Sequence, residues 1–286
     1  MKILFTSILA CFTFIQINGQ ALDNSLLWKI SGKNLSSPSY LFGTIHMICP
    51  DDLVMKDYFQ STLSETDQVV FELDMDNPQL MAQMQQFGVN ESMKNISAEM
   101  TDEQQKVVNN FLQKNYGLSL QQIGIMKPFA IMTMVLPKYL DCEQPAAYEQ
   151  IFVQEAQKSS IDILGIETVE FQMGILDDAP LQRQIEMLVE AITDSVKMKK
   201  EFEQMVAAYQ KEDLNALYQL SKENPQYAEF EDALINDRNE NWIAPMEGFM
   251  QDKSTFFAVG ALHLAGEQGV IKLLRNAGYT VEPVEN

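Results

Sequence analysis

The sequence is poor in positive charge. It has 20 lysine and arginine residues against 40 aspartate and glutamate residues, which gives a formal net charge of −20. Proteins that bind nucleic acids or anionic membrane surfaces need clustered basic residues that interact with phosphates. The sequence contains no such cluster, so we expect no nucleic-acid partner.

The sequence also has few cysteines. It lacks long apolar runs after the N-terminus and the serine motif common in hydrolases. Three cysteines in 286 residues exclude a small scaffold held together by many disulfides. After the N-terminus, no stretch is apolar over the roughly 20 residues that a membrane span needs, so we expect no transmembrane segment in the mature chain. No Gly-x-Ser-x-Gly motif occurs, which argues against the serine hydrolases that present their nucleophile in this motif.

The N-terminus has the pattern of an export signal. Lys2 is followed by a largely apolar stretch over residues 3–17 and then by small and polar residues at 18–21. A positive start, a short apolar segment and a small polar exit are typical of a secretory signal peptide. We therefore predict a signal peptide over residues 1–20, a single domain over 21–286, and an exported protein that is periplasmic, secreted or held at the outer surface.

Two cysteines remain after this segment, Cys49 and Cys142. In an oxidising compartment they could form one disulfide. That bond needs Cα atoms less than about 7 Å apart, and the sequence alone leaves open whether the two residues come within this reach.

Short apolar runs typical of strands alternate with stretches of helical periodicity. The runs that predict strands are 26–30, 40–45, 68–73, 161–166, 255–259 and 279–283. The stretches that predict helices are 53–63, 104–112, 181–192, 201–220, 227–250 and 268–276. This order predicts an α/β fold with a central sheet flanked by helices. The excess of helical periodicity over about 78–225 indicates a large helical insertion.

Only two histidines occur, His46 and His263, and both end a Gly-x-x-His pattern that follows a predicted strand. Glycine makes up 13 of 286 residues, so the chance of a glycine three positions before one histidine is about 4.5%, and before both about 0.2%. Ligands bind at strand ends in open α/β sheets, and imidazole is the commonest metal ligand. The pair therefore predicts one shared metal site, with two purely structural histidines as the alternative.

Two glutamates follow predicted strands and could complete such a site. Glu72 comes after the apolar residues 69–71, and Glu167 comes after the strand predicted at 161–166. Because two histidines rarely hold a metal alone, Glu72 or Glu167 is expected to ligate the metal or to act as the base. A carboxylate at such a position must otherwise be paired or solvated, as at a helix N-cap or an open strand end.

An arginine interrupts the apolar stripe of the helix predicted at 227–250. The residues that repeat every fourth position are Phe230, Leu234, Arg238, Trp242 and Met246. Arginine is rarely buried unless it is paired, and its planar fork suits a carboxylate. We therefore expect Arg238 to meet Glu72, Glu167 or a substrate carboxylate, and the adjacent Asn239 to hydrogen-bond a bound group. The alternative is that Arg238 extends to water.

Together these motifs resemble the TraB/GumN family, which is related to the TIKI metalloproteases. The segments that carry the resemblance, in order along residues 26–285, are 43–46, 70–73, 164–172, 237–242 and 260–264. The resemblance implies an α/β fold of the TraB/TIKI/EreA/ChaN type, with both Gly-x-x-His motifs facing one cleft. In relatives the helix before the Glu167 strand commonly begins with Gly-x-Asp, whereas this chain has Ala147, Tyr148 and Glu149 there.

For TIKI-like members the resemblance implies metal-dependent peptide hydrolysis, supported by manganese or cobalt, with zinc as a further candidate. The residues implied for the site are His46 and His263 as metal ligands, Glu72 or Glu167 as ligand or base, and Arg238 and Asn239 as residues that position the substrate or fix a carboxylate. The predicted function is an exported metal-dependent hydrolase, a metallopeptidase that acts on a peptide or protein substrate. The alternative is a non-catalytic extracytoplasmic protein that binds a peptide or another ligand in the same cleft.

Overall fold

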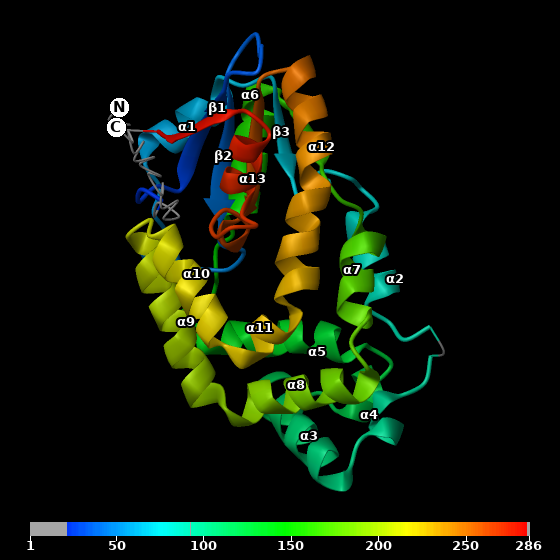
Figure 1. Ribbon diagram of the computed structural model, residues 1–286. Coiled ribbons are helices and arrows are strands. Elements are labelled where there is room, and N and C mark those ends of the chain that lie inside the picture. Colours follow the sequence, from blue (N-terminus) through cyan, green and yellow to red (C-terminus); the bar gives the residue numbers. More distant parts are fainter. Residues whose placement is uncertain (1–21, 92, 285–286) are drawn as a thin grey trace, which may run out of the picture.

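A six-stranded mixed sheet forms the centre of the protein. The computed structural model describes residues 22–91 and 93–284, so the predicted signal peptide lies outside the described residues. The strands are β1 (Leu27–Ser31), β2 (Ser39–Thr44), β3 (Gln68–Phe71), β4 (Asp162–Gly165), β5 (Thr255–Gly260) and β6 (Thr280–Pro283). Their order in the sheet is β4-β3-β5-β2-β1-β6, with helices around it (Figure 1). This confirms the predicted α/β class.

Helices dominate the remainder of the described chain. In chain order they are α1 (Asp57–Ser64), α2 (Leu80–Phe87), α3 (Asp102–Tyr116), α4 (Leu120–Ile123), α5 (Pro128–Val135), α6 (Tyr148–Ser159), α7 (Val169–Asp177), α8 (Leu181–Thr193), α9 (Ser195–Gln210), α10 (Leu214–Glu223), α11 (Pro225–Glu231), α12 (Asp237–Asp252) and α13 (Val270–Asn276). The short 3₁₀ turns are η1 (Pro50–Asp52), η2 (Ile96–Glu99), η3 (Leu136–Tyr139) and η5 (Ala261–His263). A π-helical turn, η4 (Asp232–Asn236), joins α11 to α12.

Four neighbouring strands run in the same direction. β3 pairs in parallel with β4 and β5, and β5 pairs in parallel with β2, whereas β1 pairs antiparallel with β2 and β6. Parallel strands need long crossover connections, which the helices supply here. The carboxyl ends of the four parallel strands therefore meet at one edge of the sheet, and the residues that follow each strand gather there.

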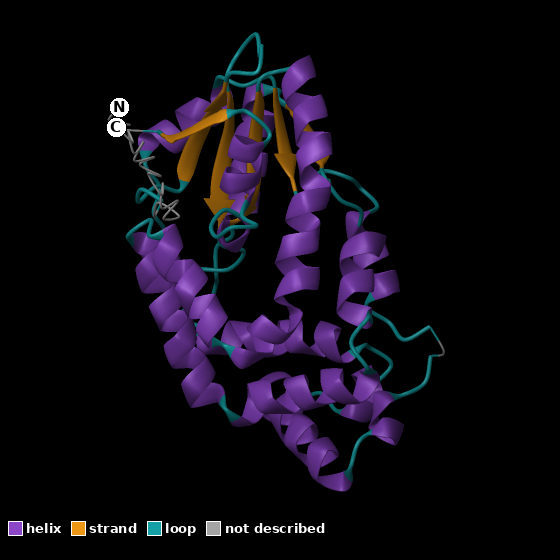
Figure 2. Cartoon of the chain, viewed as in Figure 1, coloured by secondary structure: helices purple, strands orange, loops and turns teal. Residues whose placement is uncertain are grey.

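Different helices cover the two faces of the sheet. Because side chains alternate along a strand, Phe256 and Phe257 of β5 point to opposite faces. Phe256 packs against Phe152 of α6, with ring centroids 5.3 Å apart, and Phe257 packs against Phe249 of α12, with ring centroids 6.3 Å apart. Beyond the sheet edge lies a part made of helices alone (Figure 2).

The helical part has an apolar core of its own. Leu112 of α3, Ile131 of α5 and Leu188 of α8 are fully buried in it and belong to a cluster separate from the one around the sheet. No helix among residues 22–91 and 93–284 combines the length and the apolar character that crossing a membrane requires.

The stretch predicted to be helical at 201–220 forms parts of two helices, so the prediction is wrong if it is taken as one continuous helix. The stretch is broken between α9 and α10 by Glu212, which has a φ of 56° in the left-handed region. The buried Glu212 carboxylate accepts a hydrogen bond from the backbone nitrogen of Leu26 at 3.2 Å and pairs with Lys56. The residue at the break thus links the helical part to the segments around the sheet. The apolar periodicity of the sequence continues across this position, so it did not predict the break.

A disulfide joins the loop after β2 to the segment before α6. Cys49 and Cys142 are bonded, with Cα atoms 5.7 Å apart and a sequence separation of 93. Beside this bond, Ile48 and Ala146 form an isolated antiparallel bridge. The two links hold the loop that carries His46 next to the N-terminus of α6.

Replacing Cys49 and Cys142 by alanine should lower the free energy of unfolding by about 2–5 kcal/mol, because the disulfide restricts the unfolded chain. Urea denaturation of the oxidised wild type and of the double variant measures this difference. Wild-type protein reduced with dithiothreitol is the matched control and should denature like the variant. A double variant as stable as the oxidised wild type would contradict the expectation.

Candidate functional site

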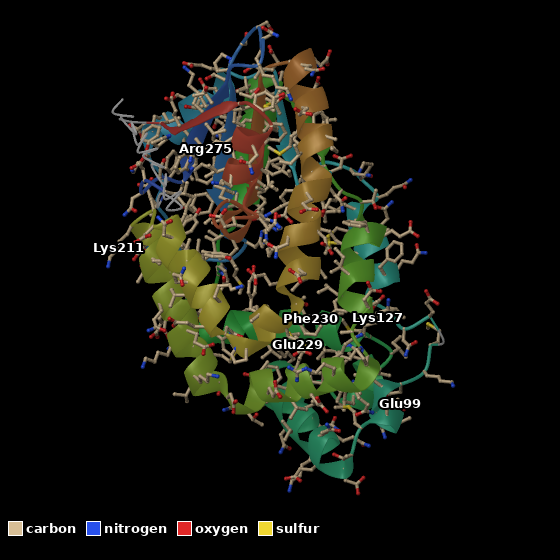
Figure 3. The ribbon with its side chains drawn as sticks, in the orientation of Figure 1. Glu99, Lys127, Lys211, Glu229, Phe230 and Arg275 are labelled. Carbon is tan, nitrogen blue, oxygen red and sulfur yellow. A yellow bond between two sulfur atoms is a disulfide. The ribbon has the colours of Figure 1, made fainter. Side chains whose placement is uncertain are left out.

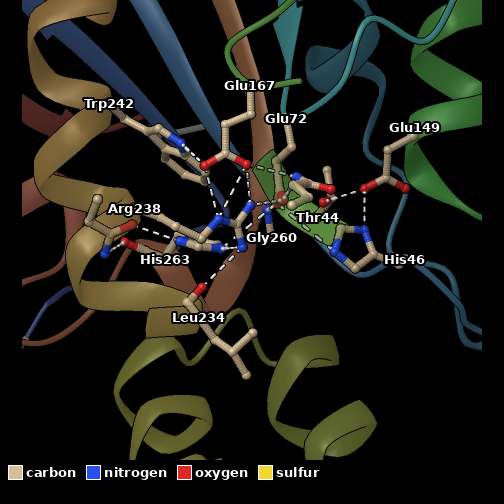
Figure 4. Close-up of polar contacts among 12 residues, drawn as sticks. Thr44, His46, Glu72, Glu149, Glu167, Leu234, Arg238, Trp242, Gly260 and His263 are labelled. Atoms are coloured by element: carbon tan, nitrogen blue, oxygen red, sulfur yellow. Dashed lines mark hydrogen bonds and ion pairs between the residues drawn. The ribbon is translucent and has the colours of Figure 1, made fainter. Parts of the chain in front are cut away.

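The two Gly-x-x-His motifs lie side by side at the carboxyl ends of β2 and β5 (Figure 4). A Cβ atom built on Gly43 would come within 3.1 Å of the Cα atom of Ala261. A Cβ atom on Gly260 would lie 3.3 Å from Glu72 Oε1 and 3.5 Å from His46 Nε2. The two glycines therefore allow the motifs to pack closely and leave room between the histidine rings.

Glu72 lies between the two imidazole rings. Its Oε1 atom is 4.0 Å from His46 Nε2 and 3.9 Å from His263 Nε2. The same oxygen accepts a hydrogen bond from the backbone nitrogen of Gly260 at 2.8 Å. Because Glu72 directly follows β3, its side chain extends past the end of the sheet, and three residues distant in sequence meet at one point.

His46 is held through its Nδ1 atom by Glu149, at the start of α6. Nδ1 lies 2.8 Å from Glu149 Oε1, to which Thr44 Oγ1 also donates at 2.7 Å. Burial opposes protonation of His46, but the hydrogen bond and charge of Glu149, with the charge of Glu72, outweigh it and raise the pKa of His46 to about 9. The ring is fixed at one nitrogen, while 66% of the His46 side chain is exposed to the space beside it.

His263 is also held through Nδ1, but it is buried. Asn239 Nδ2 donates to the carbonyls of His263 and Gln268 at 3.1 and 2.8 Å, which fixes the orientation of the amide. Asn239 Oδ1, 2.7 Å away, must therefore accept from the protonated Nδ1 of His263, and Nε2 carries the lone pair. Burial lowers the pKa of His263 to about 3, so the ring is neutral at neutral pH.

Arg238 connects the two glutamates and the second histidine. Its Nε and Nη2 atoms donate to Glu167 at 3.0 and 2.8 Å, and Nη2 also donates to Glu72 at 2.6 Å. Nη1 donates to the carbonyl of Leu234 at 3.0 Å and lies 3.2 Å from His263 Nε2. A guanidinium has five N–H donors, and all five are engaged by these partners. The prediction that Arg238 meets Glu72, Glu167 or a substrate carboxylate is thus confirmed, and the structure shows that it meets both glutamates.

Glu167 is enclosed by hydrogen-bond donors. In addition to Arg238, its carboxylate accepts hydrogen bonds from Trp242 Nε1 at 2.7 Å and from Gln172 Nε2 at 2.8 Å. Its side chain is only 4% exposed. Glu167 therefore contacts the rest of the site through Arg238 and Gln172.

Glu72 has a different environment and faces a cavity. Burial alone would raise the pKa of Glu72, but the positive charges of His263, His46 and Arg238 and the Gly260 N–H lower it to about 2. Because His263 is itself neutral above about pH 3, Arg238 and His46 supply the positive charge at neutral pH. Glu72 is therefore an anion at the cavity wall.

The cavity has a volume of about 770 Å³ and lies between the sheet edge and the helical part. His46, Glu72 and Arg238 form part of its wall. Most of the remaining wall is apolar and includes Leu136, Met173, Ile175, Leu176, Met205, Leu220, Leu234 and Leu262. This volume is within the range of about 300–1,000 Å³ found for small-molecule sites.

A closed metal site is not preformed in the described part of the chain. Among those residues, no group of three or more histidine, cysteine, aspartate or glutamate side chains is arranged as the ligands of one ion. The two Nε2 atoms and Glu72 Oε1 face one another at the distances given above, and Arg238 lies beside them.

The comparison with known families matches nearly all of the described residues. A model of the TraB/PrgY/gumN family matches residues 26–283, which include every strand and every site residue named above. The chain belongs to the TraB/PrgY/GumN family. No curated protein and no solved structure gives a significant match. Family membership alone assigns no reaction to the site.

Two residues of this TraB/PrgY/GumN site were missed by sequence reasoning. Glu149, which holds His46, stands where the resemblance implies the aspartate of a Gly-x-Asp pattern, and that departure from the pattern was the available signal. Gln172 of α7 donates to Glu72 at 3.1 Å and to Glu167 at 2.8 Å. Gln172 is the last residue of the segment 164–172 that carries the family resemblance, but the resemblance implied no role for it in the site.

Proposed function

We propose that this TraB/PrgY/GumN protein is an exported metal-dependent hydrolase that cleaves peptide bonds. The observation that carries the proposal is the orientation of the two imidazoles, each held through Nδ1 and turned with Nε2 toward Glu72. Metal-ligating histidines are typically oriented through their other ring nitrogen by a carboxylate or another oxygen acceptor. Two imidazole nitrogens and a carboxylate oxygen fit manganese, cobalt or zinc.

The charges in the site also favour a divalent cation. Imidazole binds metals in its neutral form. With neutral histidines, the site contains the carboxylates of Glu72, Glu149 and Glu167 and one guanidinium, that of Arg238. The two negative charges that remain match the charge of one divalent cation. The Nη1 contact of Arg238 with His263 would then be replaced, while the guanidinium keeps both of its glutamate partners.

The residues that follow β2, β3 and β5 would act directly. His46 and His263 would hold the cation through Nε2, and Glu72 would ligate it or accept the proton of the attacking water. A cation bound there supplies Lewis-acid polarisation of the substrate carbonyl. The residues behind them would act by positioning: Glu149 and Asn239 orient the rings, and Glu167 keeps Arg238 against Glu72.

Two features support export. The disulfide between Cys49 and Cys142 is of the kind that persists in oxidising compartments such as the periplasm or the extracellular space. Residues 1–20 have the composition of a signal peptide. We therefore propose that the mature protein acts outside the cytoplasm.

Metal content and metal affinity of the mature protein test the proposed function. We expect about one equivalent of manganese, cobalt or zinc per chain, and a loaded protein that cleaves members of a peptide library. Glu149→Gln should weaken metal affinity by about 10- to 100-fold, as is typical when a residue that orients a ligand is changed. Glu170→Gln, an exposed glutamate of α7, is the matched control and should bind like the wild type. No binding at micromolar metal would contradict the proposal.

A second candidate is capture of a peptide or another ligand without cleavage. It is favoured by the complete pairing of Arg238, which holds the site together without a cation. Under this proposal a peptide would be retained by the protein intact, and cleavage products would not form with or without added metal.

A further inference from the structure

A small apolar pocket adjoins the large cavity of the site. It has a volume of about 80 Å³ and lies where α5, α7, α8 and α11 meet. Phe230 of α11, labelled in Figure 3, forms part of its wall. Ile175, Leu176 and Leu234 line both spaces. Leu234 also gives its carbonyl oxygen to Arg238, so one residue contacts the pocket, the cavity and the charged cluster.

One polar side chain faces this pocket. Of the described residues that line it, Gln184 of α8 alone is polar, and it is only 9% exposed. Its Nε2 atom donates to the carbonyl of Ala179 at 2.8 Å. A carbonyl can only accept, so the orientation of the amide is fixed, and the remaining atom is Oε1. Among the described residues, this buried oxygen has no hydrogen-bond partner.

A buried acceptor without a donor is unfavourable, and such groups in proteins are nearly always paired. The pocket therefore discriminates between two kinds of apolar group. A group that ends in a hydroxyl or N–H can pair with Oε1 of Gln184, whereas a hydrocarbon of the same shape leaves this oxygen unpaired. The apolar wall would contact the body of either group equally.

We propose that this pocket binds an apolar group that ends in a hydrogen-bond donor, as a phenol does, with the donor given to Gln184 Oε1. The pocket takes the hydroxyl end, beside the residues that it shares with the larger cavity. Phe129 and Phe230 offer aromatic surface, and Met132 and Met187 are side chains that adapt to a ligand. That the pocket selects a tyrosine-like side chain of the substrate rests on the proposed function; the binding itself does not.

p-Cresol and toluene are the probes that test this proposal, because they differ only by the hydroxyl. In a pocket without an acceptor, toluene binds more tightly, since p-cresol must bury an unpaired hydroxyl. With Gln184 as acceptor, we expect p-cresol to bind to the wild type at least about 3-fold more tightly than toluene. The methyl NMR signals of labelled Met132 and Met187 report binding and its place, in buffer with EDTA so that no metal takes part.

A matched pair of variants completes the test. Gln184→Leu should reverse the order of the two ligands. Gln182→Leu, on the same helix but exposed and paired with the carbonyl of Glu99, should keep the wild-type order. Equal or tighter binding of toluene to the wild type would overturn the proposal, as would signal changes only at other methionines. The comparison of p-cresol with toluene on the wild type tests the proposal even if Gln184→Leu does not fold. This test measures neither metal binding nor turnover. Its outcome is therefore independent of whether the hydrolase proposal is correct.

Discussion

His46→Ala should lower the affinity for manganese, cobalt or zinc by more than about 100-fold. The expected loss of affinity exceeds the 10- to 100-fold effect of changing a residue that only orients a ligand, because a ligand itself is removed. The free energy of unfolding at neutral pH should fall as well, because the change leaves the buried carboxylate of Glu149 without its positively charged partner. Metal titration and urea denaturation of the same variant measure the two quantities.

The second histidine provides the contrast. His263 is only 4% exposed, and its ring packs on Trp242 with centroids 4.3 Å apart. His263→Ala should therefore lose metal affinity as His46→Ala does, and it should lose stability for a different reason, because it leaves a cavity and an unpaired Asn239 oxygen. The variant with both histidines replaced should show only nonspecific metal binding. Retained site binding or peptide cleavage in His46→Ala would show that the cation does not lie between these rings.

Arg238→Met should lower the free energy of unfolding by about 3–5 kcal/mol, the range seen when one partner of a buried ion pair is removed. Methionine keeps much of the apolar volume of the arginine side chain. The loss therefore comes mainly from leaving the carboxylates of Glu72 and Glu167 without their shared cation, at side-chain exposures of 12% and 4%. Urea denaturation of the metal-free protein measures the effect.

Two further variants identify the cause of that loss. Arg183→Met removes an arginine of α8 that pairs near the surface with Glu229 at 2.8 Å, and it should cost no more than about 1 kcal/mol. Adding Glu167→Gln to Arg238→Met should restore part of the stability, since one buried negative charge is neutralised. If the double change were less stable than Arg238→Met alone, unpaired charge would not be the cause.

The strands could be predicted from sequence because each is a short apolar run bounded by turn residues. The run at 68–73 became β3, although the strand ends at Phe71, and Glu72 lies just beyond it. The order of the strands was out of reach, because the place of β5 between β2 and β3 depends on pairing across long sequence separations. The break at Glu212 was also out of reach, because its cause is a tertiary contact with Leu26 and Lys56.

Part of the site could be predicted for a similar reason. The repeated Gly-x-x-His pattern and the arginine in an apolar stripe are local signals, and they identified His46, His263 and Arg238. The different environments of Glu72 and Glu167 depend on which donors surround each carboxylate, and these come from α7 and α12. Periodicity carries no information about such neighbours. The contact of Glu149 with His46 spans 103 residues and depends on how the two segments are tied together.

The central place of β5 determines when the molecule can assemble. This strand is translated after the other three parallel strands, yet it separates β3 from β2 in the sheet. Until residues 255–263 have left the ribosome, β2 and β3 lack the strand that pairs with both of them. His263 has not been made at that stage either. A growing or truncated chain therefore cannot close its sheet.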